Sequence, residues 1–371
     1  MSEAYIRAGL VGVTGYTGME LTRILASHPS MKLVLATSRA EAGRRIDDIY
    51  PFMANLEGGD VVICEPDVEA IAAACDVVFL AVPHKTAMGI AEVLYQHGVR
   101  VVDLSADFRI RNADTYEAWY HVEHSCKELI KEAVYGLPEL YGNDVKNAKI
   151  VANPGCYPTS AIIGLAAALK ADIVHTDDIV IDSKSGTSGA GRKAVVTSLF
   201  CEVHDSFRAY GLGKHRHTPE IEQELSLLAG KADTEEGLTV SFNPHLLPID
   251  RGILSTMYLR LRSPMTLDEV HALYSEFWAK HQAANIDNPS GDGSAKWVRV
   301  LPKGKLPETR HVRGTMFCDL GIVVDERTNR LIIVSAIDNV CRGASGQAVA
   351  NANLMFGLPV NAGLNFAPFM P

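Results

Sequence analysis

The sequence predicts an α/β fold in two parts: a parallel-sheet domain, then an α+β domain with a mostly antiparallel sheet. Three observations lead to this prediction. Before Cys156, short apolar segments alternate with amphipathic ones, whereas after it strand-like segments follow one another with few helices between them. The 371 residues also exceed the length that one ordinary core accommodates.

In the first part, apolar runs of strand length are separated by amphipathic segments of helix length, which is typical of a parallel sheet covered on both faces. The expected strands are Ile6–Val13, Lys32–Thr37, Val61–Cys64, Val77–Val82, Arg100–Leu104 and Ile150–Ala152. The expected helices are Met19–Ala26, Val68–Ala74, Thr86–Gln96 and Thr159–Lys170.

In the second part, strand-like segments predominate, which favours an antiparallel sheet with helices on one side. The expected strands are Ile179–Lys184, Thr239–Phe242, Gly252–Leu261 and Gly314–Val324. The expected helices are Glu220–Leu228, Thr266–Ala279 and the Ala- and Asn-rich stretch Gly346–Phe356.

Composition narrows the classes of function. Hydrophobic residues make up 47% and charged residues 21%, as in globular proteins, and no apolar run approaches the roughly 20 residues that span a bilayer. A net charge of -9 without a basic cluster argues against nucleic acid as a partner. The N-terminus lacks the features of a signal peptide, and seven scattered cysteines without a Cys-x-x-Cys pair predict neither disulfides nor a metal site. We therefore expect a cytoplasmic protein with no membrane partner.

The first strand runs directly into a glycine-rich turn. Glycines three residues apart, between a strand and a helix, let the backbone approach a pyrophosphate, and the helix N-terminus offers N–H groups to that anion. Such a turn is a weak signal alone, but its place at the start of the alternating section favours a Rossmann-type dinucleotide site. The expected cofactor-binding residues are Gly12, Thr14, Gly15, Tyr16, Thr17 and Gly18.

The end of the second strand indicates which dinucleotide binds. An NAD-binding domain usually carries an acidic residue there, which bonds the ribose hydroxyls, whereas this chain has Ser38 and Arg39. Both side chains suit a 2′-phosphate, so NADP(H) is the expected cofactor. The alternative interpretation is that Arg39 is an ordinary solvated loop residue.

Cys156 follows an apolar strand and comes just before an apolar helix. A helix N-terminus favours the thiolate over the thiol, and its N–H groups can hold an oxyanion. Pro158 is tolerated in the first turn of a helix. A thiolate beside a nicotinamide predicts that the sulfur attacks an activated acyl group and that hydride then reduces the thioester to an aldehyde. The alternative is a buried structural cysteine.

This reaction needs an acid–base partner, and histidine titrates near neutrality. His217 precedes a helix for which Thr218 is the expected N-cap and Pro219 the expected first residue, so it lies on a loop that can project it into a cleft. His215 is a competing candidate. The residues alone leave the choice between the two histidines open.

Two other segments have anion-binding features. Arg109 follows a strand end, where α/β folds bind ligands, and its guanidinium suits a phosphate. The loop from Ser185 to Arg192 is rich in glycine and serine, and its N–H groups can form an anion nest. Ser188 and Gly189 of this loop are expected to bind the cofactor. A flexible connection is the alternative for this loop.

These motifs together resemble the N-acetyl-γ-glutamyl-phosphate reductase family of arginine biosynthesis. The resemblance spans nearly the whole chain, and the combination is more specific than any single motif. The matching segments are Gly12 to Leu21, Asp103 to Arg109, Tyr135 to Glu139, Asn153 to Thr159, Ser185 to Arg192, His215 to Glu220 and Asp338 to Ala348.

The resemblance implies that a small acyl phosphate, N-acetyl-γ-glutamyl phosphate, is reduced by NADPH to the semialdehyde and phosphate. It implies Cys156 as the nucleophile and His217 as the acid–base catalyst, with Asn339 beside the nicotinamide. The residues expected to bind substrate are Arg109, Asn153, His215 and Arg216. Two positions depart from the family's common residues: Arg342 replaces lysine and Ser345 replaces alanine, and neither change removes a catalytic group.

The resemblance also implies a domain arrangement. Residues 1–155 and 341–371 would form the Rossmann-type NADP-binding domain, with the C-terminal helix returning to it. Residues 156–340 would form the catalytic and dimerisation domain. A strand-rich second domain makes a homodimer or homotetramer the expected assembly.

Three rival interpretations remain open. Aspartate-semialdehyde dehydrogenases share the architecture and the pairing of cysteine with histidine, but the motifs around Cys156 and His217 favour the acetylglutamyl reductases. A lysine-pathway reductase that acts on a carrier-bound α-aminoadipyl phosphate has very similar motifs, and the acidic net charge argues mildly against docking an acidic carrier. A non-catalytic NADP(H) sensor on a Rossmann scaffold usually lacks the nucleophile, which is present here.

Overall fold

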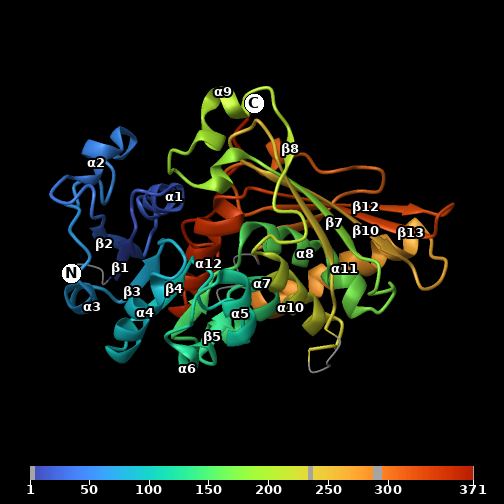
Figure 1. Cartoon of the computed structure of the whole chain (residues 1–371), viewed down its shortest axis with the longest axis horizontal. Coiled ribbons are helices and arrows are strands. Elements are labelled where there is room, and N and C mark those ends of the chain that lie inside the picture. Colours follow the sequence, from blue (N-terminus) through green and yellow to red (C-terminus); the bar gives the residue numbers. More distant parts are fainter. Residues whose placement is uncertain (1–4, 233–236, 287–294, 371) are drawn as a thin grey trace. The chain divides into compact units, whose positions relative to one another are not determined.

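The computed structural model describes residues 5–232, 237–286 and 295–370. The chain divides into two compact units (Figure 1). Unit 1 comprises Met1–Pro154, Asn285–Ala295 and Ala344–Asn365, and unit 2 comprises Gly155–Ala284, Lys296–Gly343 and Phe366–Pro371. Each unit has its own sheet, one parallel and one mixed, which confirms the predicted α/β class.

Unit 1 contains a six-stranded parallel sheet in the order β2-β1-β3-β4-β6-β5. Its strands are β1 Ile6–Val11, β2 Met31–Thr37, β3 Val77–Leu80, β4 Arg100–Asp103, β5 Ala133–Tyr135 and β6 Ile150–Ala152. Its helices are α1 Tyr16–Leu25, α2 Ile46–Ile49, α3 Val68–Ala74, α4 Ala87–Gln96, α5 Ala113–Tyr120, α6 Lys127–Ile130, α7 Pro138–Val145 and α12 Gly346–Met355, with a 3-10 turn at Pro51–Met53. This is the doubly wound architecture of dinucleotide-binding domains.

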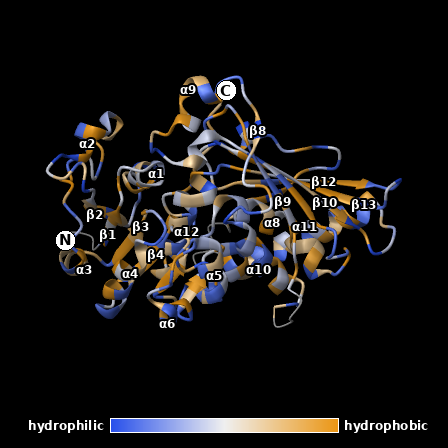
Figure 2. Ribbon diagram, in the orientation of Figure 1, coloured by the Kyte–Doolittle hydropathy of each residue, from blue (hydrophilic) through white to orange (hydrophobic). Residues whose placement is uncertain are grey.

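Strand composition explains the parallel sheet. All four residues of β3 are apolar and fully buried, and hydrophobic residues are concentrated along this strand in Figure 2. Helices cover both faces of a parallel sheet, so its central strands are apolar throughout. The carboxyl ends of β1, β2 and β4 therefore present their following turns at one edge, where such sheets bind ligands.

Helix α12 belongs to unit 1 although it lies near the end of the chain. All ten of its residues are buried, and it packs against α1, α7 and β4. Asn351 donates hydrogen bonds to the carbonyl of Gly136 (2.8 Å) and to Oδ1 of Asn153 (3.1 Å). The final helix thus completes the packing of a domain whose sheet comes from the first 154 residues.

Unit 2 contains a seven-stranded mixed sheet in the order β11-β12-β13-β10-β7-β9-β8, in which most neighbouring strands are antiparallel. Its strands are β7 Val180–Ser185, β8 Arg208–Ala209, β9 Ser241–Leu246, β10 Ile253–Arg260, β11 Val298–Val300, β12 Cys318–Asp325 and β13 Arg330–Ile337. Its helices are α8 Cys156–Lys170, α9 Phe200–Val203, α10 Thr218–Leu228 and α11 Leu267–Ile286, whose last two residues are grouped with unit 1. Helix α8 packs on β10 and β13, and α10 packs on α8 (Figure 1).

The structure corrects several expected elements. The segment Val61–Cys64 forms no named strand and makes only isolated bridges, from Cys64 to Thr37 and from Val62 to Arg45. The helix expected from Thr159 begins at Cys156, because Pro158 fits any position of a helix's first turn. The elements not predicted from the sequence include α5, α7 and β13. A single strand was expected where β12 and β13 form an antiparallel pair joined by a short turn.

Candidate active site

The glycine-rich turn of unit 1 lies between β1 and α1. Gly12 has a φ of 94°, and a Cβ on it would lie 2.3 Å from the carbonyl oxygen of Ala81. A Cβ on Gly18 would lie 2.5 Å from the carbonyl oxygen of Gly12, so the helix approaches the strand at a distance that only glycine permits. Gly15 is the N-cap of α1, and a Cβ on it would make only an ordinary contact, 3.9 Å from the carbonyl oxygen of Gly12. This turn fits a pyrophosphate held against a helix N-terminus.

The other predicted residues of this site lie close by in unit 1. Thr14, Tyr16 and Thr17 complete the turn, and the carbonyl of Thr17 accepts the Ser345 hydroxyl at 2.8 Å. Ser38 and Arg39 follow β2, and the Ser38 N–H donates to the carbonyl of Cys64 (3.0 Å) while Arg39 is exposed.

An unpaired polar atom lies at the same strand end. The hydroxyl oxygen of Thr37 is buried without a hydrogen-bond partner among the described residues. Buried polar groups are normally paired, so a ligand hydroxyl or phosphate oxygen fits beside it. The residues present at this edge therefore suit a dinucleotide.

Arg109 and Asn153 are both buried in unit 1. The Arg109 side chain donates to the carbonyls of Asn153 (2.7 Å) and Leu104 (2.8 Å) and is only 6% exposed. Asn153 donates to the carbonyl of Ala344 at 3.2 Å. These bonds tie the ends of β4 and β6 together, and the binding of substrate by either residue remains a prediction.

An acidic pair supports the same edge of unit 1. Burial, together with the nearby charge of Asp107, raises the pKa of Asp103 to about 7. Asp107 accepts the N–H groups of Lys85 and Ala87 and the hydroxyl of Tyr116. This carboxylate therefore organises the turn that follows β3.

In unit 2, Cys156 is the first residue of α8 and is partly buried. The preceding Gly155 donates its N–H to Oε1 of Glu220 at 2.8 Å, and its carbonyl accepts both the N–H and the hydroxyl of Thr159 at 2.9 Å. The positive end of the helix favours the thiolate form of the thiol. The turn before the nucleophile is therefore held from both sides.

Gly343 closes one side of this turn. It lies in the π-helical segment Cys341–Ser345, and a Cβ on it would lie 2.6 Å from the Cβ of Cys156. Its N–H donates to the carbonyl of Asp338 at 2.9 Å. The Asp338 carboxylate in turn accepts the guanidinium of Arg251 and the N–H groups of Val340 and Cys341. The segment that contacts the nucleophile is thus fixed by a buried carboxylate.

The two candidate histidines lie together before α10. His217 is the N-cap of this helix, whereas the sequence had suggested Thr218. The rings of His215 and His217 have centroids 5.0 Å apart, and Tyr157 from α8 contacts both. Because Tyr157 adjoins Cys156 in the chain, one aromatic side chain links the helix of the nucleophile to both histidines.

His215 is enclosed by aromatic rings, and its pKa is lower than that of an ordinary histidine. Tyr210 and Phe242 contact it, and its Nδ1 accepts the backbone N–H of His217 at 3.1 Å. Burial lowers the pKa of His215 to about 4, with a further contribution from the charge of Arg216. At neutral pH its ring is therefore uncharged, and a proton on Nε2 follows from the bond that Nδ1 accepts.

Three other predicted residues also meet in unit 2. Asn339 accepts the N–H of Gly252 at 2.7 Å and donates to the Ser188 hydroxyl at 2.9 Å. A Cβ on Gly189 would lie 3.6 Å from the Asn339 amide nitrogen. Arg216 is exposed. The roles of these four residues in binding cofactor or substrate stay predictions.

Several residues of this site have no role predicted from the sequence. Glu220 is fully buried beside Gly155, and Tyr157 and Tyr210 share a hydrogen bond of 2.8 Å between their hydroxyls. Burial raises the pKa of Tyr157, and that of Tyr210 to about 12, so both hydroxyls stay protonated. The local signal for Glu220 is its place in the first turn of the helix after His217, which is typical of a capping carboxylate and does not indicate a contact with Gly155.

The described residues contain neither a cluster of metal-binding side chains nor a membrane-spanning helix. No cluster of three or more histidine, cysteine or carboxylate side chains there could hold a metal ion. Within the same residues, no helix combines the length and the apolar character needed to cross a bilayer.

Comparisons with known proteins give one family. A family model for the NAD binding domain of semialdehyde dehydrogenases matches residues 7–148, and one for the semialdehyde dehydrogenase dimerisation domain matches residues 156–339. The chain is 50% identical to the N-acetyl-gamma-glutamyl-phosphate reductase of Citrifermentans bemidjiense and 49% identical to that of Desulfotalea psychrophila. Both alignments cover 99% of this chain and 100% of the relative.

Solved structures share the fold at low identity. Aspartate semialdehyde dehydrogenase with NADP from Candida albicans has a TM-score of 0.70 at 18% identity, covering 95% of this chain and 99% of that one. Aspartate semialdehyde dehydrogenase II from Vibrio cholerae has a TM-score of 0.66 at 15% identity, covering 95% and 98%.

Proposed function

Because the chain belongs to the semialdehyde dehydrogenase family and, within it, to the N-acetyl-γ-glutamyl-phosphate reductases, we propose that it reduces N-acetyl-γ-glutamyl phosphate with NADPH in arginine biosynthesis. The products are N-acetylglutamate semialdehyde and phosphate. The observation that carries this proposal is the setting of Cys156, at the first position of α8 and linked through Tyr157 to two histidines. A thiol held in this way is a nucleophile for an acyl phosphate.

Unit 1 holds the cofactor in this proposal. Support comes from the glycine-only approach of α1 to β1, the buried hydroxyl oxygen of Thr37, and Ser38 with Arg39 at the end of β2. Ser38 and Arg39 provide a hydroxyl and a positive charge for a 2′-phosphate, which favours NADP(H) over NAD(H). When bound, NADPH supplies the hydride.

Cys156 and His217 carry the chemistry. The thiol gives its proton to His217, and the sulfur attacks the acyl carbon; the carbon–oxygen bond to phosphate breaks, and the proton leaves with the phosphate. Hydride addition to the thioester gives a tetrahedral oxyanion on Cys156, which N–H groups of the α8 N-terminus stabilise. The oxyanion re-forms the carbonyl, the carbon–sulfur bond breaks, and the thiolate takes back a proton by way of His217.

The electrostatics of His215 argue against it as the proton carrier, which leaves His217 for that role. A general base at neutral pH works best with a pKa near that pH. The pKa of His215 is about 4 because the ring is buried, and its Nδ1 is occupied by the His217 N–H. His215 is thus a neutral support that fixes the backbone of His217, and any contact with substrate comes from its Nε2 as a donor.

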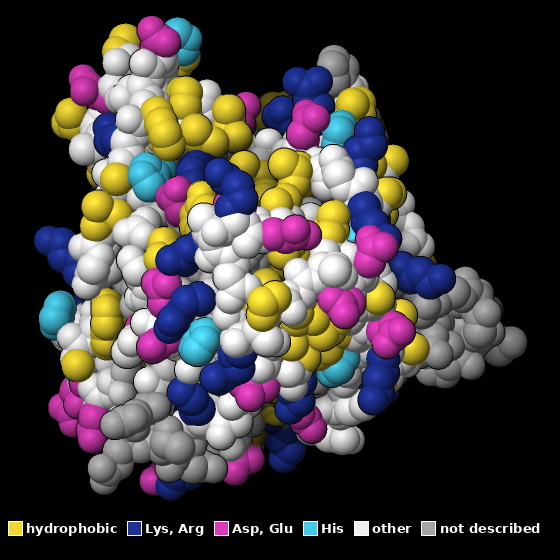
Figure 3. Space-filling view, turned by 90° about the vertical axis from the view of Figure 1, so that its right-hand side faces the viewer, with side chains coloured by type: hydrophobic (Ala, Val, Ile, Leu, Met, Phe, Trp, Pro, Cys, Tyr) yellow, Lys and Arg dark blue, Asp and Glu magenta, His cyan; other side chains and the backbone are white. Residues whose placement is uncertain are grey.

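We also propose that the protein forms a homodimer or homotetramer. Seven exposed apolar side chains lie between residues 195 and 212, and Ile249 is an eighth. The seven are Val195, Val196, Leu199, Phe200, Phe207, Tyr210 and Leu212. Figure 3 shows hydrophobic side chains gathered in the upper part of the face that it presents. Such a patch in a chain that matches a dimerisation-domain model supports burial against a second copy.

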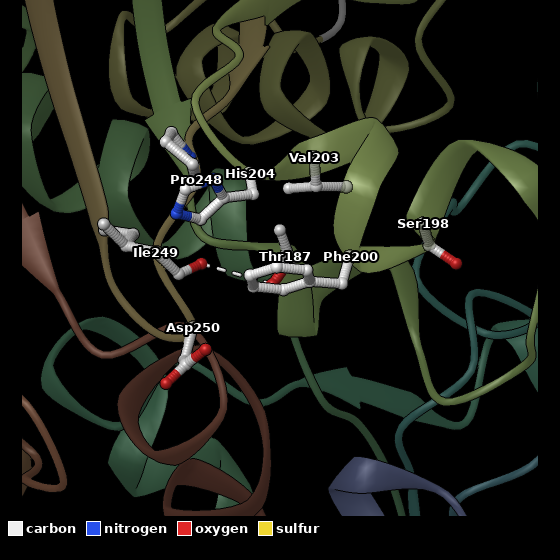
Figure 4. A pocket seen from close by; sticks show the side chains of 8 residues that line it. All are labelled: Thr187, Ser198, Phe200, Val203, His204, Pro248, Ile249 and Asp250. Carbon is white, nitrogen blue, oxygen red and sulfur yellow. Dashed lines mark hydrogen bonds between the residues drawn. The ribbon is translucent and has the colours of Figure 1, made fainter.

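A pocket of about 240 Å³ adjoins this patch, and the Phe200 ring lies beside it (Figure 4). Thr187 donates to the carbonyl of Ile249 across its floor at 3.2 Å. The volume is below that of ordinary ligand pockets and suits one side chain from a partner. Light scattering on the wild type and on Phe200→Asp tests the assembly, because a charge at this position would shift the population towards monomer.

We place the protein in the cytoplasm, because its seven cysteines form no disulfide among the described residues and thiols persist in a reducing compartment.

The decisive assay runs the reaction in reverse. Wild type should reduce NADP+ in the presence of N-acetylglutamate semialdehyde and phosphate, and Cys156→Ser should not. Absence of turnover by the wild type would reject this substrate. Equal turnover by the variant would remove Cys156 from the mechanism.

A further inference from the structure

A row of buried hydroxyls crosses the sheet of unit 2. Ser183 in β7, Ser255 in β10 and Ser335 in β13 stand directly opposite one another on neighbouring strands, and all three are fully buried. On the same face, the positions two residues away in β10 are Ile253 and Met257, which are also fully buried. A polar row in an apolar face has no solubility role, because no water reaches it.

Ser160 from α8 completes this row into one hydrogen-bonded group, here named the serine cluster: Ser160, Ser183, Ser255 and Ser335. The Ser160 oxygen lies 2.8 Å from that of Ser255 and 3.1 Å from that of Ser335. Ser183 and Ser255 are 2.7 Å apart, and the thiol of Cys318 lies 3.5 Å from Ser335. Every hydroxyl of the cluster therefore has a partner, which removes the usual penalty of burying it.

Ser160 brings the serine cluster within one helical turn of the nucleophile. Ser160 is four residues after Cys156, so the two side chains share a face of α8 one turn apart. The strands of the cluster also lead to the loops around the nucleophile. Each strand of the cluster ends two or three residues from its serine: β7 ends at Ser185, Gly252 precedes β10, and Asp338 follows β13. The cluster thus connects the helix of Cys156 to the strand ends that hold those loops.

Hydrogen bonds fix a helix in a way that apolar packing does not. Burial of apolar surface is non-directional, so by itself it specifies the rotation of α8 less sharply than a hydrogen bond does. Hydrogen bonds weaken steeply with angle and distance, and a displaced α8 would leave buried hydroxyls without partners. The cluster therefore specifies both the rotation of α8 and its position along its axis.

We propose that the serine cluster is a positioning device for catalysis, in which Ser160 sets the place of the Cys156 sulfur relative to Gly343 and Asn339. None of the four serines touches the reacting atoms. This inference rests on the proposed reductase function only where turnover is the measurement.

Two variants separate positioning from stability. Ser160→Ala leaves buried hydroxyls short of a partner, so its urea midpoint should fall. The quadruple variant S160A/S183A/S255A/S335A replaces all the hydroxyls by apolar groups, so much of that loss should be recovered. Ser226→Ala is the matched control, because Ser226 is also buried in unit 2 and accepts the N–H of Leu238 at 2.8 Å.

Turnover of folded protein is the first measurement. For a positioning device, kcat falls at least threefold in the single and the quadruple variant, while KM for the acyl substrate changes less than twofold and Ser226→Ala matches wild type. A quadruple variant whose kcat stays within threefold of wild type would reduce the cluster to a structural role and overturn the proposal.

The second measurement does not depend on turnover. Iodoacetamide alkylation at neutral pH is followed by peptide mass spectrometry, with the exposed Cys64, which lies outside the patch proposed to pack against a second copy, as internal reference. The rate constant at Cys156, relative to Cys64, should change at least threefold in both variants. An unchanged ratio overturns the proposal whatever the turnover. If wild type shows no turnover at all, only the reductase assignment fails, and the alkylation ratio still tests whether the serine cluster positions Cys156.

Discussion

Replacing Gly343 by alanine tests how tightly the nucleophile is held. The new Cβ would lie 2.6 Å from the Cβ of Cys156 and 3.0 Å from its Cα, and ordinary contacts begin at 3.4 Å. One of the two segments must therefore move by about 0.8 Å, and neither contact atom is the end of a flexible side chain. The backbone of Gly343 is not in the left-handed region, so the contact alone causes the effect.

The magnitude follows from two general relations. Overpacking of this kind costs about 1–3 kcal/mol of unfolding free energy. A misplacement of about 1 Å at the reacting atom lowers the rate by about 100-fold. We expect Gly343→Ala to lose about two orders of magnitude in kcat, measured by phosphate-dependent NADP+ reduction, and to unfold at a lower urea concentration.

The control is Gly89→Ala, in the first turn of α4, where nothing lies within 4 Å of the added methyl group. It should keep full turnover, and its unfolding free energy should rise by about 0.4–1 kcal/mol. A kcat for Gly343→Ala within twofold of wild type would show that the position of Cys156 tolerates the shift. The reasoning about a tightly held nucleophile would then be refuted.

Three more predictions follow from the site. Arg39→Gln should raise KM for NADPH about tenfold or more and leave kcat/KM with NADH unchanged; parallel losses with both cofactors would contradict a 2′-phosphate contact. The pKa of His215 is about 4 in the folded protein and 6.5 ordinarily, so between these pH values the unfolded chain binds a proton that the folded protein does not. The free energy of unfolding therefore falls as the pH drops from 6.5 to 4, by up to about 1.4 kcal/mol per pH unit. His215→Asn, which keeps an acceptor for the His217 N–H, should flatten urea stability over that window; an unaltered pH dependence would mean that His215 titrates normally. Glu220→Ala should lower kcat at least tenfold, whereas Glu220→Gln, with its amide oxygen as acceptor for Gly155, should stay within threefold; equal losses would assign the role to charge.

Local sequence patterns predicted the features that depend on neighbouring residues. The turn from Gly12 to Gly18 was recognisable because glycine spacing, strand and helix are contiguous. The succession along the chain, a parallel sheet first and a mostly antiparallel sheet second, was recognisable for the same reason. Element ends were less accurate: Pro158 indicated a first turn without fixing which residue begins it, so Cys156 proved to be inside the helix rather than before it.

Contacts between distant segments left no local pattern. The bond from Gly155 to Glu220 joins residues 65 apart, and Gly343 meets Cys156 from near the other end of unit 2. The serine cluster depends on the register of β7, β10 and β13, and one of these strands was not expected at all. Such features require the three-dimensional pairing of strands, which residue periodicity does not determine.

The late position of α12 has a consequence for synthesis. Chains grow at about 5–20 residues per second, so residue 344 leaves the ribosome roughly 10–40 s after residue 154. During that time the parallel sheet lacks the helix that covers β4 and α7, and Asn351 is not yet present to pair with Gly136. The last strand of the mixed sheet ends at Ile337, so that sheet can form before α12 is made. The first-made sheet is therefore the last to gain its covering helix, and its uncovered face is prone to aggregation in the interval.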